Sequence, residues 1–224
     1  MDQYKKDFID FMVRSKALTF GDFVTKSGRK TPFFINTGNY STGAQLERLG
    51  LYYAEALRQH LGNGFNVLFG PAYKGIPLAV AASMALSARY SHNVSFCFNR
   101  KEAKDHGEGG AMVGHRLCAG DRVVIIEDVA TAGTSVRESV PLLANNTGAK
   151  VVGLVVSVDR MERGTGEKSA LAELRGEFGF SAFSIVNIDE IVEHLHNREI
   201  DGVIALTDGL VKRIEEYRKE YGCS

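Results

Sequence analysis

The sequence has no excess of charge of either sign, because its 27 lysines and arginines balance its 27 aspartates and glutamates. A neutral chain lacks the overall basic field that recruits nucleic acid or an anionic membrane surface. We therefore expect no nucleic-acid partner and no membrane partner. Any phosphate group must be bound by a local cluster of cations and N–H donors.

Long hydrophobic runs, a signal sequence and a cysteine framework are also missing. The longest mostly apolar run, residues 76–88, is about half as long as a membrane span requires. Residues 1–13 carry too many charges for a secretory signal. The 3 cysteines are far apart and lack metal-ligand spacing, which is typical of reduced thiols. These features predict a soluble, cytoplasmic chain.

The sequence does contain a regular alternation of strands and helices, and its 224 residues are enough for one α/β domain. Continuous Val and Ile runs in such an alternation predict a central parallel sheet with helices on both faces. Residues 1–62 would form an accessory region on a core at 63–224. We predict strands at 66–69, 94–98, 122–126, 150–158 and 183–188, and helices at 5–18, 44–61, 76–89, 136–145, 168–178, near 190 and at 208–221.

Ligands of such sheets bind at the carboxyl ends of the strands, and the most informative segment follows the strand at 122–126. Two carboxylates, Glu127 and Asp128, precede a loop of small residues that leads into a helix. N–H groups at a helix N-terminus suit a phosphate dianion, and carboxylates suit sugar hydroxyls or a metal-bound polyol. The alternative is a solvated strand end followed by an ordinary N-cap. The loop residues are Val129, Ala130, Thr131, Ala132, Gly133, Thr134 and Ser135.

Other nucleotide-binding motifs fail on spacing. The glycines at positions 70 and 75 are spaced as in a P-loop, but Ile76 stands where lysine is required. No Gly-x-Gly-x-x-Gly follows a predicted strand. The residues alone therefore indicate an α/β protein that binds a phosphosugar.

The segment 123–135 resembles the phosphoribosyl diphosphate signature of the type I phosphoribosyltransferases, although the first acidic position, often Asp in that family, is Glu127 here. The resemblance implies that Glu127 and Asp128 contact the ribose hydroxyls and that residues 131–135 hold the 5′-phosphate. It also implies the fold of that family, a central parallel sheet flanked by helices with a small N-terminal hood at about 1–62.

A second cluster follows the strand at 94–98 and combines cations with glycines. A mobile cationic segment suits a departing diphosphate, since closure neutralises the anion and expels water. An exposed, salt-bridged loop is the competing interpretation, because three acidic residues dilute the charge. The pattern Arg-Lys-x-x-Lys-x-His is similar to that of the orotate phosphoribosyltransferases, which implies a lid near 100–114 that reaches across a homodimer. Its residues here are Arg100, Lys101, Lys104 and His106, and the catalytic candidates are Lys104, Arg100 and Asp128.

Residues 23–36 are similar to the hood of the same family. The resemblance implies that Lys26 contacts both substrates and that Phe34 and Ile35 lie against the orotate ring. A planar anionic base needs a flat apolar wall and cationic donors at its carboxylate. One of Phe33 and Phe34 is expected in the core, because successive strand residues point to opposite faces.

Two further strand ends complete the resemblance. In the segment 70–77, Tyr73 and Lys74 would meet the diphosphate. After the strand at 150–158, Arg160 would bind the orotate carboxylate, for which a guanidinium is well shaped. Thr131 would contact orotate as well, whereas we expect Arg163 to form a structural salt bridge.

These resemblances predict an orotate phosphoribosyltransferase, a pentosyltransferase of pyrimidine biosynthesis. It would join orotate to phosphoribosyl diphosphate in a homodimer, with Mg²⁺ held mainly by substrate oxygens and water rather than by protein ligands. Two alternatives remain open at this point. A purine phosphoribosyltransferase would share residues 127–135 but would not need Lys26 and Arg160. A non-catalytic regulator that senses phosphoribosyl diphosphate would keep the phosphate loop without the lid.

Overall fold

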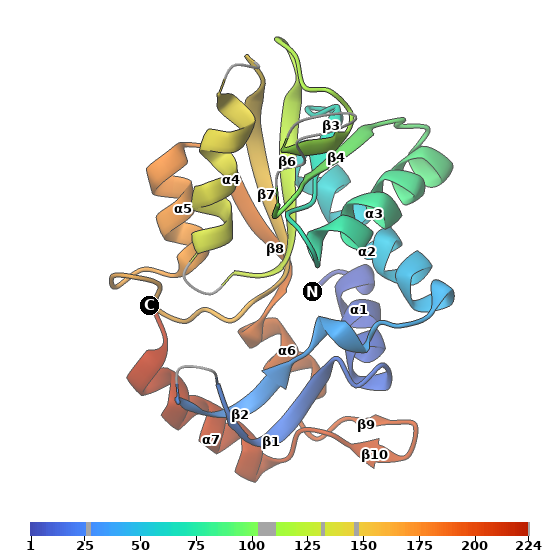
Figure 1. Cartoon of the computed structure of the whole chain (residues 1–224). Helices are drawn as coiled ribbons and strands as arrows, with labels where there is room; N and C mark the ends of the chain where they lie inside the picture. The colour runs from blue at the N-terminus through green and yellow to red at the C-terminus, as the bar shows by residue number, and fades with distance from the viewer. Residues whose placement is uncertain (26–27, 103–110, 131–132, 146–147, 224) are drawn as a thin grey trace.

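The computed structural model describes residues 1–25, 28–102, 111–130, 133–145 and 148–223. Its centre is a six-stranded sheet in the order β5-β4-β3-β6-β7-β8 (Figure 1). All neighbouring strands run parallel except β5, which is antiparallel to β4. The mostly parallel α/β architecture is thus confirmed. The strands are β3 (Val67–Phe69), β4 (Ser95–Asn99), β5 (Met112–Gly114), β6 (Arg122–Val129), β7 (Lys150–Asp159) and β8 (Ser181–Asn187).

Helices cover both faces of this sheet, which is why its strands are apolar on both sides. Side chains such as Leu68 and Val124 belong to one core with α2 (Gly43–Leu61) and α3 (Gly75–Tyr90). Their sequence neighbours point to the opposite face, where the second core includes residues of α4 (Thr134–Ala144) and α5 (Ala170–Phe178). In Figure 1 these two pairs of helices flank the sheet on opposite sides.

The first and last parts of the chain lie together below the sheet in Figure 1. The antiparallel pair β1 (Leu18–Val24) and β2 (Lys30–Ile35) packs against α7 (Asp208–Tyr221). The remaining elements are α1 (Gln3–Arg14), the short 3-10 helix η1 (Thr37–Asn39), α6 (Ile188–Leu195), β9 (Glu199–Ile200) and β10 (Val203–Ile204). The division into an accessory region at 1–62 and a core at 63–224 stays a prediction. Contacts cross that boundary in both directions, because α2 packs on α3 and the sheet while α7 packs on β2.

Two local expectations can be compared with the hairpin and the sheet. Phe33 is fully buried and Phe34 is 39% exposed, which confirms that one of the two belongs to the core. The sequence analysis did not predict β5 or the β9–β10 hairpin, and β5 falls inside the region 100–114 that was predicted as a lid.

Among the described residues, no helix combines the length and the hydrophobicity that crossing a bilayer requires.

The strand order fixes where a ligand can bind. From β3 the chain moves outward to β4 and β5, then returns to β6 on the other side of β3 and continues to β7 and β8. The order therefore reverses between β3 and β6. In open α/β sheets this reversal leaves a crevice outside the carboxyl ends of the strands. The loops after β3 and β6 border that crevice, and the loop after β7 is next to it.

Candidate active site

The main-chain carbonyls of the acidic pair at the end of β6 accept hydrogen bonds from two buried hydroxyl side chains. The Tyr53 hydroxyl on α2 donates to the Glu127 carbonyl at 2.7 Å, and the Ser157 hydroxyl on β7 donates to the Asp128 carbonyl at 2.5 Å. Burial, followed by the charge of Asp128, raises the pKa of Glu127 to about 7. The strand tip is held firmly, while the Glu127 side chain is unfavourable in its ionised form.

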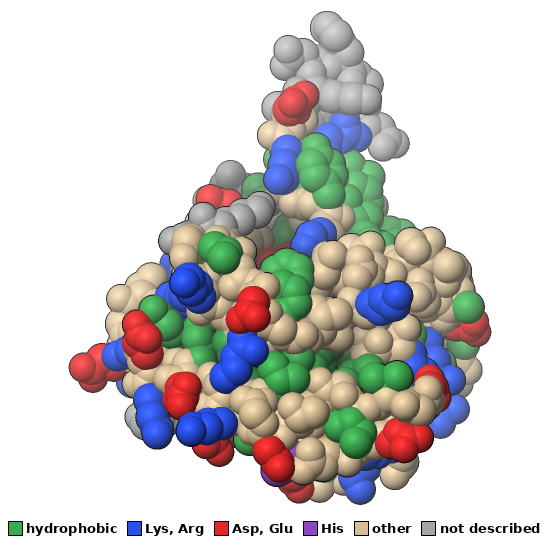
Figure 2. Space-filling view, turned by 90° about the horizontal axis from the view of Figure 1, so that it is seen from below, with side chains coloured by type: hydrophobic (Ala, Val, Ile, Leu, Met, Phe, Trp, Pro, Cys, Tyr) green, Lys and Arg blue, Asp and Glu red, His purple; other side chains and the backbone are tan. Residues whose placement is uncertain are grey.

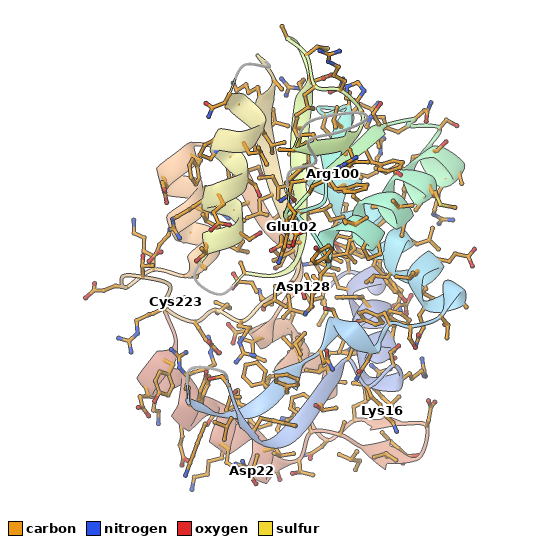
Figure 3. The ribbon with its side chains drawn as sticks, in the orientation of Figure 1. Lys16, Asp22, Arg100, Glu102, Asp128 and Cys223 are labelled. Carbon is orange, nitrogen blue, oxygen red and sulfur yellow. The ribbon has the colours of Figure 1, made fainter. Side chains whose placement is uncertain are left out.

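Asp128 joins the hood to the loop after β3, and in Figure 3 it lies between the sheet and the β1–β2 hairpin. Its Oδ2 accepts a hydrogen bond from the Thr37 hydroxyl at 2.7 Å and lies 3.1 Å from Lys74 Nζ. Its Oδ1 accepts from the Val129 N–H at 2.8 Å. The structure thus brings together Asp128 and Lys74, two site residues that were predicted separately. It adds Thr37, which the sequence analysis missed because this residue lies in a stretch of small polar residues without a distinguishing pattern.

The phosphate loop borders a cavity of about 260 Å³. Gly133 precedes the first residue of α4 with a φ of 72°, a left-handed conformation that glycine adopts most readily. The N-terminus of α4 therefore faces a space in which an anion can meet backbone N–H groups. Thr131 and Ala132 lie outside the described residues. The lining residues are Glu127, Val129, Ala130, Gly133, Thr134, Ser135 and Val136.

The loop after β3 is compact because two glycines approach each other. A Cβ atom at Gly70 would collide with the carbonyl oxygen of Gly75. The peptide bond between Ala72 and Tyr73 is cis, and the Ala72 N–H donates to Asn99 Oδ1 at 2.8 Å. Tyr73 is 67% exposed.

The predicted diphosphate residues before the lid lie next to this loop. The Lys101 ammonium is 5.1 Å from the centre of the Tyr73 ring, a geometry that allows a cation–π interaction. Arg100 directly follows β4, and its N–H donates to the Ala111 carbonyl at 2.7 Å. Figure 3 labels it at the end of β4. Lys104 and His106 lie outside the described residues.

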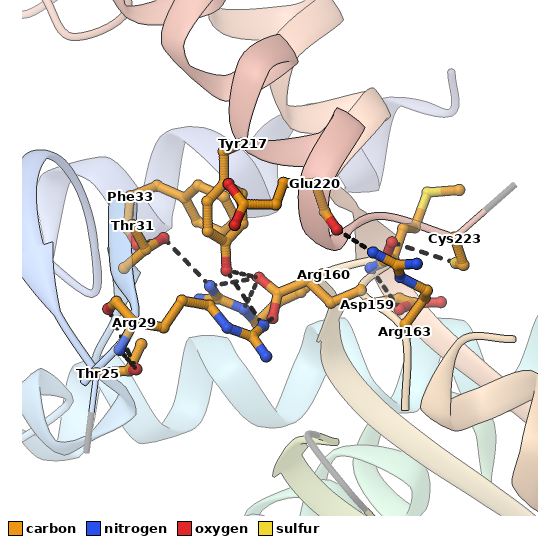
Figure 4. Close-up of polar contacts among 12 residues, drawn as sticks. Thr25, Arg29, Thr31, Phe33, Asp159, Arg160, Arg163, Tyr217, Glu220 and Cys223 are labelled. Atoms are coloured by element: carbon orange, nitrogen blue, oxygen red, sulfur yellow. Dashed lines mark hydrogen bonds and ion pairs between the residues drawn. The ribbon is translucent and has the colours of Figure 1, made fainter. Parts of the chain in front are cut away.

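The predicted orotate residues are on the hood and after β7. Arg160 stacks over the Phe33 ring at 4.3 Å, and its Nε donates to Glu162 at 2.8 Å (Figure 4). Phe34 stacks on Phe23 with 5.5 Å between ring centres, and Ile35 ends β2. Lys26 lies outside the described residues.

The residues that surround Arg160 extend beyond those predicted. Arg163 bonds the Glu220 carbonyl, so its structural partner is a main-chain oxygen rather than the carboxylate that was expected. Glu162, Arg29 and Tyr217 also gather here, and the sequence analysis missed all three. They come from three distant segments, and no local motif connects them.

Charge is distributed without a dominant patch of one sign on the face that Figure 2 shows, where basic and acidic side chains alternate. Within the described part of the chain, no group of three or more His, Cys, Asp or Glu residues is arranged to hold a metal ion.

Comparisons with known proteins agree with this geometry. Residues 37–172 match the family described as phosphoribosyl transferase domain. The chain is 57% identical to an orotate phosphoribosyltransferase of Clostridium beijerinckii and 56% identical to one of Clostridium acetobutylicum, over 99% of this chain and 99% of each relative. It is also similar to the crystal structure of an orotate phosphoribosyltransferase from Francisella tularensis. That match has a TM-score of 0.81 and 34% identity, and covers 96% of this chain and 99% of the other.

Proposed function

This chain belongs to the orotate phosphoribosyltransferase family, and from that membership we propose how its residues perform the reaction. The enzyme is a pentosyltransferase of pyrimidine biosynthesis. It transfers ribose 5-phosphate from 5-phosphoribosyl 1-diphosphate to orotate, giving orotidine 5′-phosphate and diphosphate. The observation that carries the site assignment is the meeting of Asp128 and Lys74 at 3.1 Å beside the cavity of the phosphate loop.

Phosphoribosyl diphosphate would lie across the crevice between β3 and β6. The backbone N–H groups of residues 131–135 would hold the 5′-phosphate, since this loop opens α4. Val129 and Ala130 would line the same site, with the Val129 N–H donating to Asp128. Glu127 and Asp128 would accept hydrogen bonds from the ribose hydroxyls. Cationic and aromatic residues on the other side of the crevice would surround the diphosphate: Lys26, Tyr73, Lys74, Arg100, Lys101, Lys104 and His106.

Orotate would lie between the hood and the end of β7. Phe34, which is partly exposed, and Ile35 would supply the apolar wall for the planar ring. Arg160 would bind the carboxylate, and Lys26 and Thr131 would complete the contacts. The exposure of Phe34 next to the buried Phe33 supports this arrangement, because it leaves one aromatic ring available to a ligand.

The chemical step is displacement of diphosphate from ribose C1 by a ring nitrogen of orotate. Positive charge develops on the sugar while negative charge gathers on the leaving group. Lys74, Arg100 and Lys104 would stabilise the departing anion, and closure of the lid would exclude water. Asp128 holds Lys74 at the edge of the crevice, 3.1 Å from its ammonium group. No side chain needs to act as a nucleophile.

Magnesium fits this site only if the substrate provides most of its ligands. The adjacent carboxylates of Glu127 and Asp128 are too few for a protein cage, and Mg²⁺ binds readily to one or two carboxylates together with phosphate oxygens. When bound, the ion would neutralise diphosphate oxygens and favour their departure.

We further propose a cytoplasmic homodimer in which the lid of one subunit reaches the site of the other. The unpaired thiols of Cys97, Cys118 and Cys223 are in keeping with a reducing compartment. Apolar surface for a second copy is available at Tyr73, next to the site, and at Met84, on α3. Each of these side chains is 67% exposed. Mixing Lys104→Ala with Asp128→Asn protein after mild dissociation should restore about a quarter of the wild-type activity, because a hybrid dimer keeps one intact site. No recovery would contradict the shared lid.

The test of function follows the fall in orotate absorbance when the protein is mixed with orotate, phosphoribosyl diphosphate and Mg²⁺. We expect orotate to be consumed, and we expect EDTA to abolish this reaction. Replacing orotate with hypoxanthine or adenine should give no product. Turnover of a purine instead of orotate would refute the assignment of Lys26 and Arg160. Failure to consume any base would indicate a regulator that only binds phosphoribosyl diphosphate.

A further inference from the structure

Glu162 is the centre of a polar cluster behind Arg160 (Figure 4). Its Oε1 accepts hydrogen bonds from Arg160 Nε and from the Tyr217 hydroxyl, both at 2.8 Å, and lies 2.6 Å from Arg160 Nη2. Its Oε2 accepts from Arg29 Nη1 at 3.1 Å. The Glu162 side chain is only 16% exposed. Both oxygens of this carboxylate are therefore engaged by groups from the hood, the loop after β7 and α7.

The loop that carries Arg160 and Glu162 is also fixed to the C-terminal end of the chain through its backbone. The Arg163 N–H donates to the Tyr221 carbonyl at 2.9 Å, and the Cys223 N–H donates to the Met161 carbonyl at 3.0 Å. Glu162 and Gly222 form an isolated antiparallel bridge. Because these bonds follow directly after α7, the position of that helix and the position of the loop are coupled.

These contacts leave Arg160 with one orientation. The Nε and Nη2 edge of its guanidinium faces Glu162, Nη2 is also 3.4 Å from the Thr31 hydroxyl, and the Phe33 ring covers one face. Among the described residues, no hydrogen-bond partner meets Arg160 Nη1. A guanidinium that is bound along one edge keeps its remaining N–H groups in a fixed plane, which lowers the entropy lost when it binds a carboxylate.

We propose that Glu162, supported by Arg29 and Tyr217, is a positioning residue that orients Arg160 for the carboxylate of orotate. Helix α7 is thereby part of the orotate site, although none of its residues needs to touch the substrate. The inference rests on the proposed assignment of Arg160 to orotate binding. It adds that the affinity for orotate depends on Tyr217, which lies 55 residues after Glu162 in the chain.

Positioning and simple charge predict opposite effects when Glu162 is replaced. Glu162→Gln removes a negative charge next to Arg160, which strengthens the local positive potential. If charge alone mattered, the KM for orotate would fall. If orientation matters, the KM rises, because the charge-assisted hydrogen bonds that hold Arg160 are lost. The sign of the change therefore distinguishes the two explanations.

The experiment compares Glu162→Gln and Tyr217→Phe with the wild type and with Tyr52→Phe. Tyr52 is a suitable control because it is 6% exposed and its hydroxyl donates to the Asp7 carbonyl at 3.1 Å, away from the site. Steady-state kinetics give the KM for orotate, the KM for phosphoribosyl diphosphate and kcat, and thermal unfolding gives Tm.

We expect the KM for orotate to rise about tenfold in Glu162→Gln and about threefold in Tyr217→Phe. Neither change exceeds the free energy of one charge-assisted hydrogen bond. The KM for phosphoribosyl diphosphate should change by less than about twofold. Tyr52→Phe and Tyr217→Phe each remove one hydroxyl hydrogen bond, so both should lower Tm. Only Tyr217→Phe should change the KM for orotate.

A fall in the KM for orotate in Glu162→Gln, or equal changes in both KM values, would overturn the proposal. So would a Tyr217→Phe enzyme with the kinetics of Tyr52→Phe. A wild-type protein that consumes no orotate would instead refute the proposed function itself, and that result is visible before any variant is made.

Discussion

Glutamine in place of Glu127 should stabilise the unliganded protein by an amount that grows with pH. Burial and the neighbouring Asp128 raise the pKa of this carboxyl from 4.5 to about 7 in the folded state. Below pH 4.5 the group is protonated in both the folded and unfolded chains. Between pH 4.5 and 7 the folded chain binds more protons than the unfolded chain, so the stability of the wild type falls as the pH rises. Above pH 7 the penalty is complete and constant.

The size of this effect follows from the shift in pKa. A pKa that rises by roughly 2.5, at about 1.4 kcal/mol for each pH unit, gives an upper value near 3.5 kcal/mol. The side chain keeps some exposure, and solvent reduces the penalty, so we expect about 2 kcal/mol. Glutamine retains an oxygen that can accept from Ser135, which bonds the wild-type carboxylate, and it cannot ionise. The difference between the two proteins should therefore appear only where Glu127 is charged.

The assay is urea unfolding of both proteins at several pH values from about 5 to 9, without substrates. Glu47→Gln, at an exposed position of α2, is the matched control and should show no comparable pH dependence relative to wild type. The difference in unfolding free energy between Glu127→Gln and the wild type should be small near pH 5 and should increase toward pH 8. Curves that stay parallel across this range would refute the buried-carboxylate explanation, whatever their constant offset.

Two further predictions concern the lid and the opposite end of the sheet. Lys104→Ala should lower kcat about a hundredfold or more while orotate binding changes by less than about threefold; equal losses, measured by steady-state kinetics and orotate titration, would contradict a lid role. Asp121→Asn should destabilise the protein by about 2 kcal/mol near pH 7, because hydrogen bonds from Cys118, His115 and Asn66 outweigh burial and hold the pKa of Asp121 at about 2. That difference should shrink as the pH falls from about 4 toward 2, since the stabilisation disappears when the folded state takes up the proton; a difference that persists in acid would exclude this cause.

Much of the core could be predicted because its strands are buried on both faces. β6 and β7 consist mostly of branched apolar residues, so composition and flanking loops indicate the same structure. β5 could not be predicted in this way. It has three residues and is defined by its antiparallel pairing with β4, and such a pairing depends on tertiary contacts rather than on local preference.

In the candidate site, too, residues next to predicted strands could be placed from the sequence, whereas residues brought in by tertiary packing could not. Lys74, Asp128 and Arg160 could be placed because each follows a predicted strand, and parallel strands bring their carboxyl ends together. Thr37 contacts Asp128 across 91 positions, and Arg29 approaches Tyr217 across 188 positions. Such contacts depend on the packing of hood, core and α7, and no motif in the sequence encodes them. The roles predicted for all of the site residues stay predictions. Five of these residues also lie outside the described ranges: Lys26, Lys104, His106, Thr131 and Ala132.

At the end of β6, the position of the active-site carboxylate and its charge depend on different parts of the structure. Its position depends on the main chain, which the buried hydroxyls of Tyr53 and Ser157 hold through the carbonyls of Glu127 and Asp128. Its charge depends on the Glu127 side chain, which burial disfavours. Because the two are independent, Glu127→Gln should remove the charge without moving the strand. A loss of activity in a variant that is more stable than the wild type at pH 8 would then be due to the missing carboxylate, not to a displaced phosphate loop.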